Sequence, residues 1–175
     1  MNIYARKAHS FTLIELLIVV VIIGILAAII LISLTSASAK ARDVRRQQDL
    51  KNIQKALEMY YTANGNYPST TSQWWGNTSL YGSHPVSGSN GYVPNLAPTY
   101  IPSLPLDPRQ GKDCSGATAT SASYTYISDG KDYKLQAYHT VETTVPTATN
   151  ALQNFWDPHY TGCIYALFTP GAKNW

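Results

Sequence analysis

The sequence has few charged residues, only two cysteines and no recognisable catalytic frame. Charged residues make up 13% of its 175 residues, about half of the usual share. This excludes a charge-rich disordered tail, and the composition is not that of a collagen. Thirteen basic and ten acidic residues give a net charge of +3, which does not indicate nucleic-acid binding through bulk charge. The length fits one domain with an accessory element.

One long apolar run near the N-terminus holds much of the hydrophobic content. It extends from Phe11 to Leu34, and its only interruptions are Thr12, Glu15, Gly24 and Ser33. As a helix, these residues would be about 36 Å long, enough to cross a hydrocarbon core of about 30 Å. The run is longer than the apolar region of a secretory signal, so residues 11–34 are predicted to be an uncleaved membrane helix. Removal by signal peptidase after Ala37-Ser38-Ala39 is the alternative.

The charges flanking this helix leave its orientation open. Arg6 and Lys7 favour a cytoplasmic N-terminus, but the four cations that follow the run oppose it: Lys40, Arg42, Arg45 and Arg46. The cysteines, the Ser/Thr-rich loops and the low charge of the rest fit an oxidising compartment. We therefore expect a single-pass inner-membrane protein with a cytoplasmic N-terminus and an extracytoplasmic C-terminal part.

Helical periodicity continues beyond the membrane segment, so residues 35–64 are predicted to be an amphipathic continuation of one helix. Apolar or small residues recur every three or four positions, at Ala37, Ala41, Val44, Leu50, Ile53, Leu57 and Tyr60. The opposite face is charged. Gly65 and Pro68 are predicted to end the helix near Ala63.

Residues 65–175 are predicted to form a loop-rich head that covers this stripe. Six prolines mark residues 65–108 as loop. Residues 124–128 and 133–141 are predicted strands joined by the turn 129–132, and residues 163–168 are a third candidate. A small antiparallel sheet packed on the long helix gives an α+β fold.

The two cysteines, Cys114 and Cys163, are predicted to form a structural disulfide. In the chain-entropy model, a loop of this length stabilises the head by about 4 kcal/mol. No CxxC pair or His-Cys spacing indicates a metal or a reactive thiol.

The stretch from Ser10 to Ile29 (SFTLIELLIVVVIIGILAAI) follows a short basic leader. It closely resembles the processing site and first helix of type IV pilins and of type II secretion pseudopilins. The resemblance is strong over the first 60 residues. It is weaker beyond, where residues 100–108 and 124–135 are similar to the loop and hairpin of pseudopilin-like subunits.

This resemblance implies that residues 1–10 are a leader. A prepilin peptidase would cut between Ser10 and Phe11 and methylate the new Phe11 amine. The family usually has Gly where this chain has Ser10, and many members have a proline near Ile32, which this chain lacks. The resemblance also implies that Glu15 attracts the Phe11 amine of a neighbouring copy during assembly. The alternative is that Glu15 reaches the membrane interface and does nothing.

Other functional sites are weaker candidates. Asp129 and Asp132, with Asp107 or Asp113, could approach a Ca²⁺ site of the kind that some pseudopilins have, but the loop lacks alternating oxygen ligands and is predicted to be a turn. No metal or cofactor is predicted. No enzymatic activity is predicted either, since no GxSxG or other nucleophile motif occurs. Five cations form a further candidate surface on the predicted helix: Arg42, Arg45, Arg46, Lys51 and Lys55. They could contact DNA or lipid phosphates. A charged helix face of this kind is more often solvated or salt-bridged between subunits.

The resulting prediction is a non-enzymatic pilin of a type IV pilus-like filament, stored in the membrane and polymerised through its N-terminal helix into an extracellular fibre. The resemblance implies partners: other copies of the chain, the prepilin peptidase, an assembly ATPase and an inner-membrane platform protein. A pseudopilin of a type II secretion system is the alternative. A signal-anchored surface binding domain or enzyme that never polymerises is a third possibility.

Overall fold

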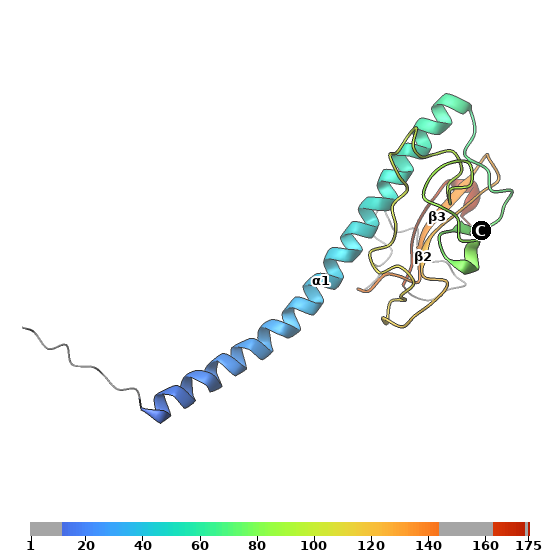
Figure 1. Ribbon diagram of the computed structural model, residues 1–175. Coiled ribbons are helices and arrows are strands. Elements are labelled where there is room, and N and C mark those ends of the chain that lie inside the picture. The colour runs from blue at the N-terminus through green and yellow to red at the C-terminus, as the bar shows by residue number, and fades with distance from the viewer. Residues whose placement is uncertain (1–11, 144–162, 174) are drawn as a thin grey trace, which may run out of the picture. The chain divides into compact units, whose positions relative to one another are not determined.

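The computed structural model describes residues 12–143, 163–173 and 175. The chain divides into two compact units, Met1–Ser38 and Ala39–Trp175. The long helix α1 (Leu13–Asn64) contributes residues to both. Figure 1 shows α1 together with the strands of the second unit, which we call the head.

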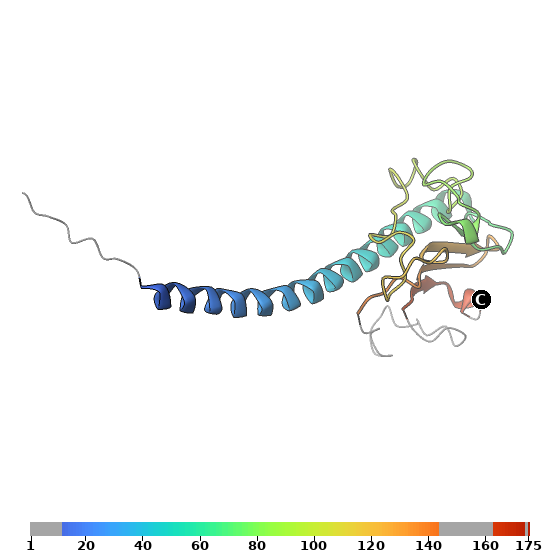
Figure 2. The same cartoon turned by 60° about the horizontal axis from the view of Figure 1, so that its bottom comes forward.

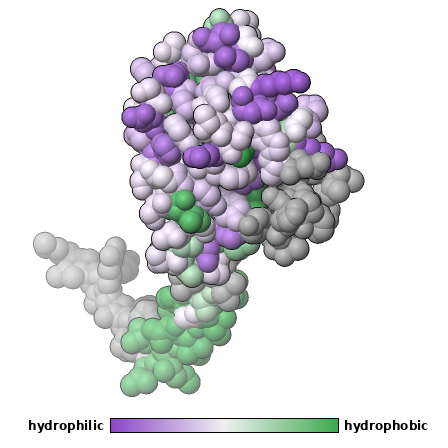
Figure 3. All heavy atoms as spheres, turned by 90° about the vertical axis from the view of Figure 1, so that its right-hand side faces the viewer, coloured by the Kyte–Doolittle hydropathy of each residue, from purple (hydrophilic) through white to green (hydrophobic). Residues whose placement is uncertain are grey.

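The first unit contains the apolar part of α1. By length and composition, α1 has one segment able to cross a membrane. The large hydrophobic side chains described between Leu13 and Ile29 are all at least 45% exposed. Figure 3 shows this part as a continuous hydrophobic surface. A helix that is apolar on all sides needs lipid or other apolar helices around it, because water would hydrate that surface at a high cost in free energy.

The head contains the second part of α1, which packs on the sheet. Leu50, Ile53 and Leu57 are no more than 1% exposed and belong to the main apolar core. The helix ends at Asn64, and Gly65 follows with a φ of +74°. A left-handed residue after the last turn is a common way to end a helix, and glycine adopts it without a Cβ clash.

The start of the buried face of α1 differs from the predicted stripe. Ala37 and Ala41 are exposed, and Val44 is 65% exposed. The buried residues there are Asp43 and Arg46. The predicted stripe is therefore wrong in its first two turns, because ion pairs between charged side chains allow these residues to be buried.

Four antiparallel strands form the sheet, in the order β1-β2-β3-β4: β1 (Trp75–Gly76), β2 (Ser123–Ser128), β3 (Tyr133–Tyr138) and β4 (Tyr165–Phe168). The register places Tyr126 opposite Leu135, and Leu135 opposite Leu167. These residues join the same core as Leu50 and Leu57 of α1. Figure 2 shows the sheet beside α1. The predicted α+β fold, a long helix packed on a small antiparallel sheet, is confirmed.

β2 begins at Ser123, one residue earlier than predicted, and the other strands show three further differences from the prediction. β3 ends at Tyr138 instead of residue 141, because His139 has a φ of +55°, which interrupts the pleat. β4 begins at Tyr165 instead of Cys163, whose φ is +65°. β1 lies in the stretch predicted to be loop, because a strand of two residues is too short to show an alternating pattern in the sequence. Two short 3-10 helices complete the described elements, η1 (Ser79–Tyr81) and η2 (Pro170–Ala172).

These positions on α1 predict different effects of two similar truncations. Leu57→Ala removes a fully buried side chain and is expected to lower the free energy of unfolding by about 2–5 kcal/mol. Val44→Ala, at an exposed position, is the matched control and is expected to change it by less than about 0.5 kcal/mol. Urea unfolding of the full chain in detergent, followed by tryptophan fluorescence, measures both. A larger loss for Val44→Ala would contradict this packing of α1.

Candidate assembly site

The first turn of α1 is capped by three hydrogen bonds between Thr12 and Glu15, which run in both directions. The Glu15 N–H donates to Thr12 Oγ1 (3.3 Å). In return, the Thr12 N–H and hydroxyl donate to Glu15 Oε2 at 2.9 and 2.7 Å. This is a capping box, which satisfies N–H groups at the helix start that would otherwise lack a partner.

The capping box gives Glu15 an intrachain role, which the sequence interpretation missed. The Thr-x-x-Glu spacing is a signal for a capping box, and it is present at Thr12 to Glu15. Both donors from Thr12 use Oε2, so they leave Oε1 for a further contact. Ser10 and Phe11 lie outside the described residues, so the predicted pairing of Glu15 with a neighbour's Phe11 amine stays a prediction.

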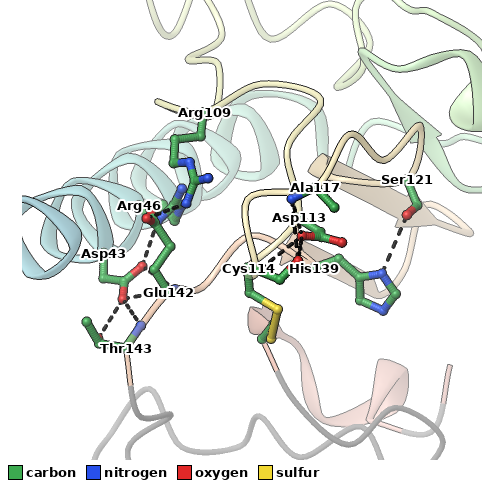
Figure 4. The surroundings of a disulfide bond; sticks show 12 residues. Asp43, Arg46, Arg109, Asp113, Cys114, Ala117, Ser121, His139, Glu142 and Thr143 are labelled. Carbon is green, nitrogen blue, oxygen red and sulfur yellow. Dashed lines mark hydrogen bonds and ion pairs between the residues drawn. A yellow bond between two sulfur atoms is a disulfide. The ribbon is translucent and has the colours of Figure 1, made fainter. Parts of the chain in front are cut away.

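A buried charge cluster ties α1 to the loops of the head. The Arg46 side chain is fully buried and contacts three carboxylates. Its guanidinium donates to Asp107 Oδ2 (2.6 Å), Asp43 Oδ1 (2.6 Å) and Glu142 Oε1 (2.9 Å). Figure 4 shows Arg46 and Arg109 converging on Glu142. The cluster joins segments that are 61 and 96 residues from Arg46 in the sequence.

Three guanidinium groups surround the Glu142 carboxylate. Besides Arg46, Arg42 donates at 2.7 and 2.6 Å, and Arg109 donates at 2.5 Å. Burial by itself raises the pKa of Glu142, but these hydrogen bonds outweigh it and lower the pKa to about 2. A carboxyl whose pKa is lowered on folding stabilises the head above its ordinary pKa. That contribution is lost as the pH falls from about 4.5 through about 2.

Asp43 fixes the backbone that follows Val141. Its carboxylate accepts the N–H groups of Glu142 (3.1 Å) and Thr143 (2.7 Å) and the Thr143 hydroxyl (2.6 Å). Asp43 also accepts from Arg46, so a single side chain links α1 to this loop. Buried charges of this kind are tolerated only when their hydrogen bonds are satisfied.

Cys114 and Cys163 form a disulfide with a Cα–Cα distance of 5.9 Å. In Figure 4 it lies beside the loop of Asp113, whose carboxylate accepts the N–H groups of Ser115 and Ala117 at 2.9 and 3.0 Å. The disulfide ties this loop to the chain immediately before β4.

The carboxylates considered for Ca²⁺ are held in three separate places. Asp107 is bound by Arg46, and Asp113 by its own loop. Asp129 accepts the N–H groups of Lys131 and Asp132, both at 2.8 Å, and so closes the turn between β2 and β3, which also carries Asp132. Within the ranges that the structure describes, no group of three or more His, Cys, Asp or Glu side chains could hold a metal.

The cations considered for DNA or lipid contact do not act as one surface. Arg46 and Arg42 are engaged inside the head, Arg46 fully buried and Arg42 with a side chain 32% exposed. Arg45 is 65% exposed and lies 3.8 Å from Asp49. Lys51 and Lys55 are exposed. The expectation of a single solvated face is wrong for Arg42 and Arg46, because three head carboxylates compensate them within the same chain.

Comparison with known families gives two matches. Residues 5–31 match the prokaryotic N-terminal methylation motif, and residues 33–141 match the model of type II secretion system protein G. The second match covers more than half of the chain. The resemblance to the type IV pilin and pseudopilin family is confirmed.

Curated relatives agree with these matches. The chain is 28% identical over 150 residues to type II secretion system core protein G of Klebsiella michiganensis, covering 86% of this chain and 94% of the relative. It is 45% identical over 65 residues to the protein of the same name from Pseudomonas aeruginosa, and 40% over 65 residues to that from Vibrio cholerae. These two matches cover 37% of the chain and about half of each relative, 46% and 44%. No solved structure matches the chain.

The buried cluster predicts that two adjacent arginines differ sharply in their effect on stability. Arg46→Met leaves three carboxylates without their shared cation and is expected to lower the free energy of unfolding by about 3–5 kcal/mol. Arg45→Met removes an exposed pair and is expected to cost less than about 1 kcal/mol. Urea unfolding of the full chain in detergent measures both. Equal effects would contradict the burial of Arg46.

Proposed function

Because this chain belongs to the type II secretion system protein G family, we propose that it is a pseudopilin, a subunit of the short periplasmic fibre of a secretion system. The observation that carries this proposal is the family match over the head, residues 33–141. The sequence alone placed a type IV pilus subunit first and a pseudopilin second. The family match and the relatives support the second better.

The proposed role is structural and not enzymatic. The apolar part of α1 is exposed on all sides and would exchange lipid contacts for contacts with the same part of other copies. The head would remain outside the membrane, on the extracytoplasmic side. In such a fibre, the apolar helices of other copies replace lipid tails that are equally apolar, so burial from water contributes little. Cohesion therefore comes from van der Waals contact and from specific charges.

The proposed partners follow from maturation and assembly. A prepilin peptidase would remove residues 1–10 and methylate the Phe11 amine, consistent with the methylation motif at residues 5–31. An assembly ATPase and an inner-membrane platform protein would then move the chain from the membrane into the fibre. Oε1 of Glu15, which Thr12 does not use, would accept the freed amine of a neighbour.

The maturation step gives the first prediction. When the full chain is expressed with a prepilin peptidase, the mature protein is expected to begin at a methylated Phe11. Intact-mass measurement and N-terminal sequencing check this, and a catalytically inactive peptidase is the control. A chain that still begins at Met1, or begins at Lys40, would contradict the proposed processing.

The assembly step gives the second prediction. Glu15→Ala is expected to leave membrane insertion unchanged but to reduce fibre yield and protein secretion at least about tenfold, because a charge pair would lose one partner. Glu15→Gln is the matched variant, since Gln can also serve in a capping box. It is expected to fail as Glu15→Ala does if the charge is what assembly needs.

The measurement uses the host secretion system in a strain that lacks the wild-type gene. Sheared fibres are quantified, and secreted proteins are compared with those retained in the periplasm. Normal secretion by the strain without this gene, together with a loss of surface pili, would overturn the proposed secretion role. Normal fibre yield with Glu15→Ala would remove the role of the carboxylate.

A further inference from the structure

The part of α1 in the head has one face that no described residue covers. Exposed side chains recur there every three or four residues, and we call this set the outer face: Val44, Gln48, Lys51, Lys55 and Met59. Val44 and Met59 are 65% and 50% exposed. Lys51 and Lys55 are one helical turn apart and have no ion pair among the residues that the structure describes. The outer face therefore combines apolar contact area with two adjacent positive charges, and Glu58 follows Lys55 by three residues on the same side of the helix.

The outer face lies in the head and not in the apolar run, because Lys51 follows Leu34 by seventeen residues in the sequence. Its exposed apolar side chains and its two lysines fit a protein surface that carries negative charge.

Tyr67 connects Glu58 of α1 to the turn between β2 and β3, which carries Asp129 and Asp132. Its hydroxyl donates to Glu58 (3.2 Å), and its N–H donates to the carbonyl of Gly130 in that turn (2.8 Å). Glu58 and Asp129 are exposed. We call Glu58, Asp129 and Asp132 the acidic end. The turn between β2 and β3 also carries Lys131, so the acidic end has three carboxylates and one neighbouring cation.

Within the acidic end, the turn between β2 and β3 favours the charged form of Asp129. The Asp129 carboxylate accepts backbone N–H groups, first that of Asp132 and then that of Lys131, which lowers the pKa of Asp129. Glu58 and Asp129 are both solvent-exposed and can approach another molecule. Along the exposed side of α1 in the head, the positive charges of Lys51 and Lys55 therefore precede the negative charge of Glu58.

We propose that the outer face of α1 receives the acidic end of a neighbouring copy of this chain. The proposal rests on the proposed function, because it places the contact within the fibre. Lys51 precedes Glu58 by seven residues, so a neighbour displaced by about 10 Å along the helix axis places Glu58 beside Lys51. Such a contact joins two different surfaces, and repeating it builds a helical filament instead of a closed dimer.

The outer face contact is separate from the contact proposed for the apolar part of α1, and the two differ in strength. Exposed charge pairs contribute little free energy, about 0–1 kcal/mol each, but unlike charges set register and like charges oppose wrong alignments. The charges therefore fix the axial displacement, and the apolar surface supplies the cohesion.

Cross-linking tests the contact in the unmodified full chain. Membranes that contain the assembled secretion system are treated with a zero-length carboxyl-to-amine reagent, and the dimer band is analysed by mass spectrometry. Links from Lys51 to Glu58, or from Lys51 or Lys55 to Asp129, are expected in the dimer band and not in the monomer band. A Lys55–Glu58 link is not counted, because these residues are three apart on one helix. A dimer band whose links all lie elsewhere would overturn the proposal.

A charge exchange tests the same contact by function. Lys51→Glu with Lys55→Glu is expected to lower fibre yield at least about tenfold, and so is Glu58→Lys with Asp129→Asn. Asp129→Asn keeps an oxygen that can accept the turn's N–H groups. All four changes together are expected to restore the yield to within about twofold of the wild type. Lys112→Glu, at an exposed lysine of another loop, is the matched control and is expected to leave the yield unchanged.

Yields are normalised to the disulfide-bonded full chain in the membrane, so a loss of folding is not scored as a loss of assembly. Wild-type yield with Lys51→Glu and Lys55→Glu, or no rescue by the fourfold variant, would overturn this interface and leave the proposed function standing. Normal fibres with defective secretion would show that another protein binds the outer face, which also overturns the proposal. If the wild-type chain forms no fibre with the complete apparatus, the proposed function fails and this interface fails with it.

Discussion

The guanidinium of Arg46 is the contact on which the arrangement of the head depends. It is fully buried, and it joins α1 to the loop of Asp107 and to the chain that follows β3 through Glu142. Burying one cation among three carboxylates costs desolvation, which only a complete set of hydrogen bonds offsets. Apolar packing by Leu50, Ile53 and Leu57 can tolerate small shifts along the helix, whereas this cluster specifies one position of α1 against the loops.

The sequence predicted the elements of the fold more successfully than their contacts. Hydrophobic periodicity and the turn chemistry of Gly65 placed the helix end within one residue, and the alternation after Asp132 identified β3. Periodicity failed at Asp43 and Arg46, because it assumes that charged side chains are exposed. Nothing in the sequence around Arg46 indicates its partners, which are distant in the chain. The predicted end of β3 was also wrong, because no reliable sequence signal indicates the left-handed backbone of His139.

The candidate site was predictable only where its residues are local. Glu15 stands out as the acid of an apolar run, and its Thr12 partner is three residues away, so a known spacing identifies the capping box. The two cysteines were the only possible pair in the chain. The charges of the outer face and of the acidic end could be listed from the sequence, but their separation into two regions required the fold, because Tyr67 brings Glu58 to the turn between β2 and β3.

The position of β4 has a consequence for the core. The match to the protein G family ends at residue 141, so β4 and Cys163 lie beyond the part that matches the family model. In the described part of the chain, β4 is at one edge of the sheet, attached by its pairing with β3 and by the bond to Cys114, which lies inside the matched part. Tyr165 and Leu167 of β4 nevertheless belong to the main core, so removing this strand would expose apolar side chains of its neighbours to water. A segment outside the family match therefore closes a core whose other walls lie inside that match.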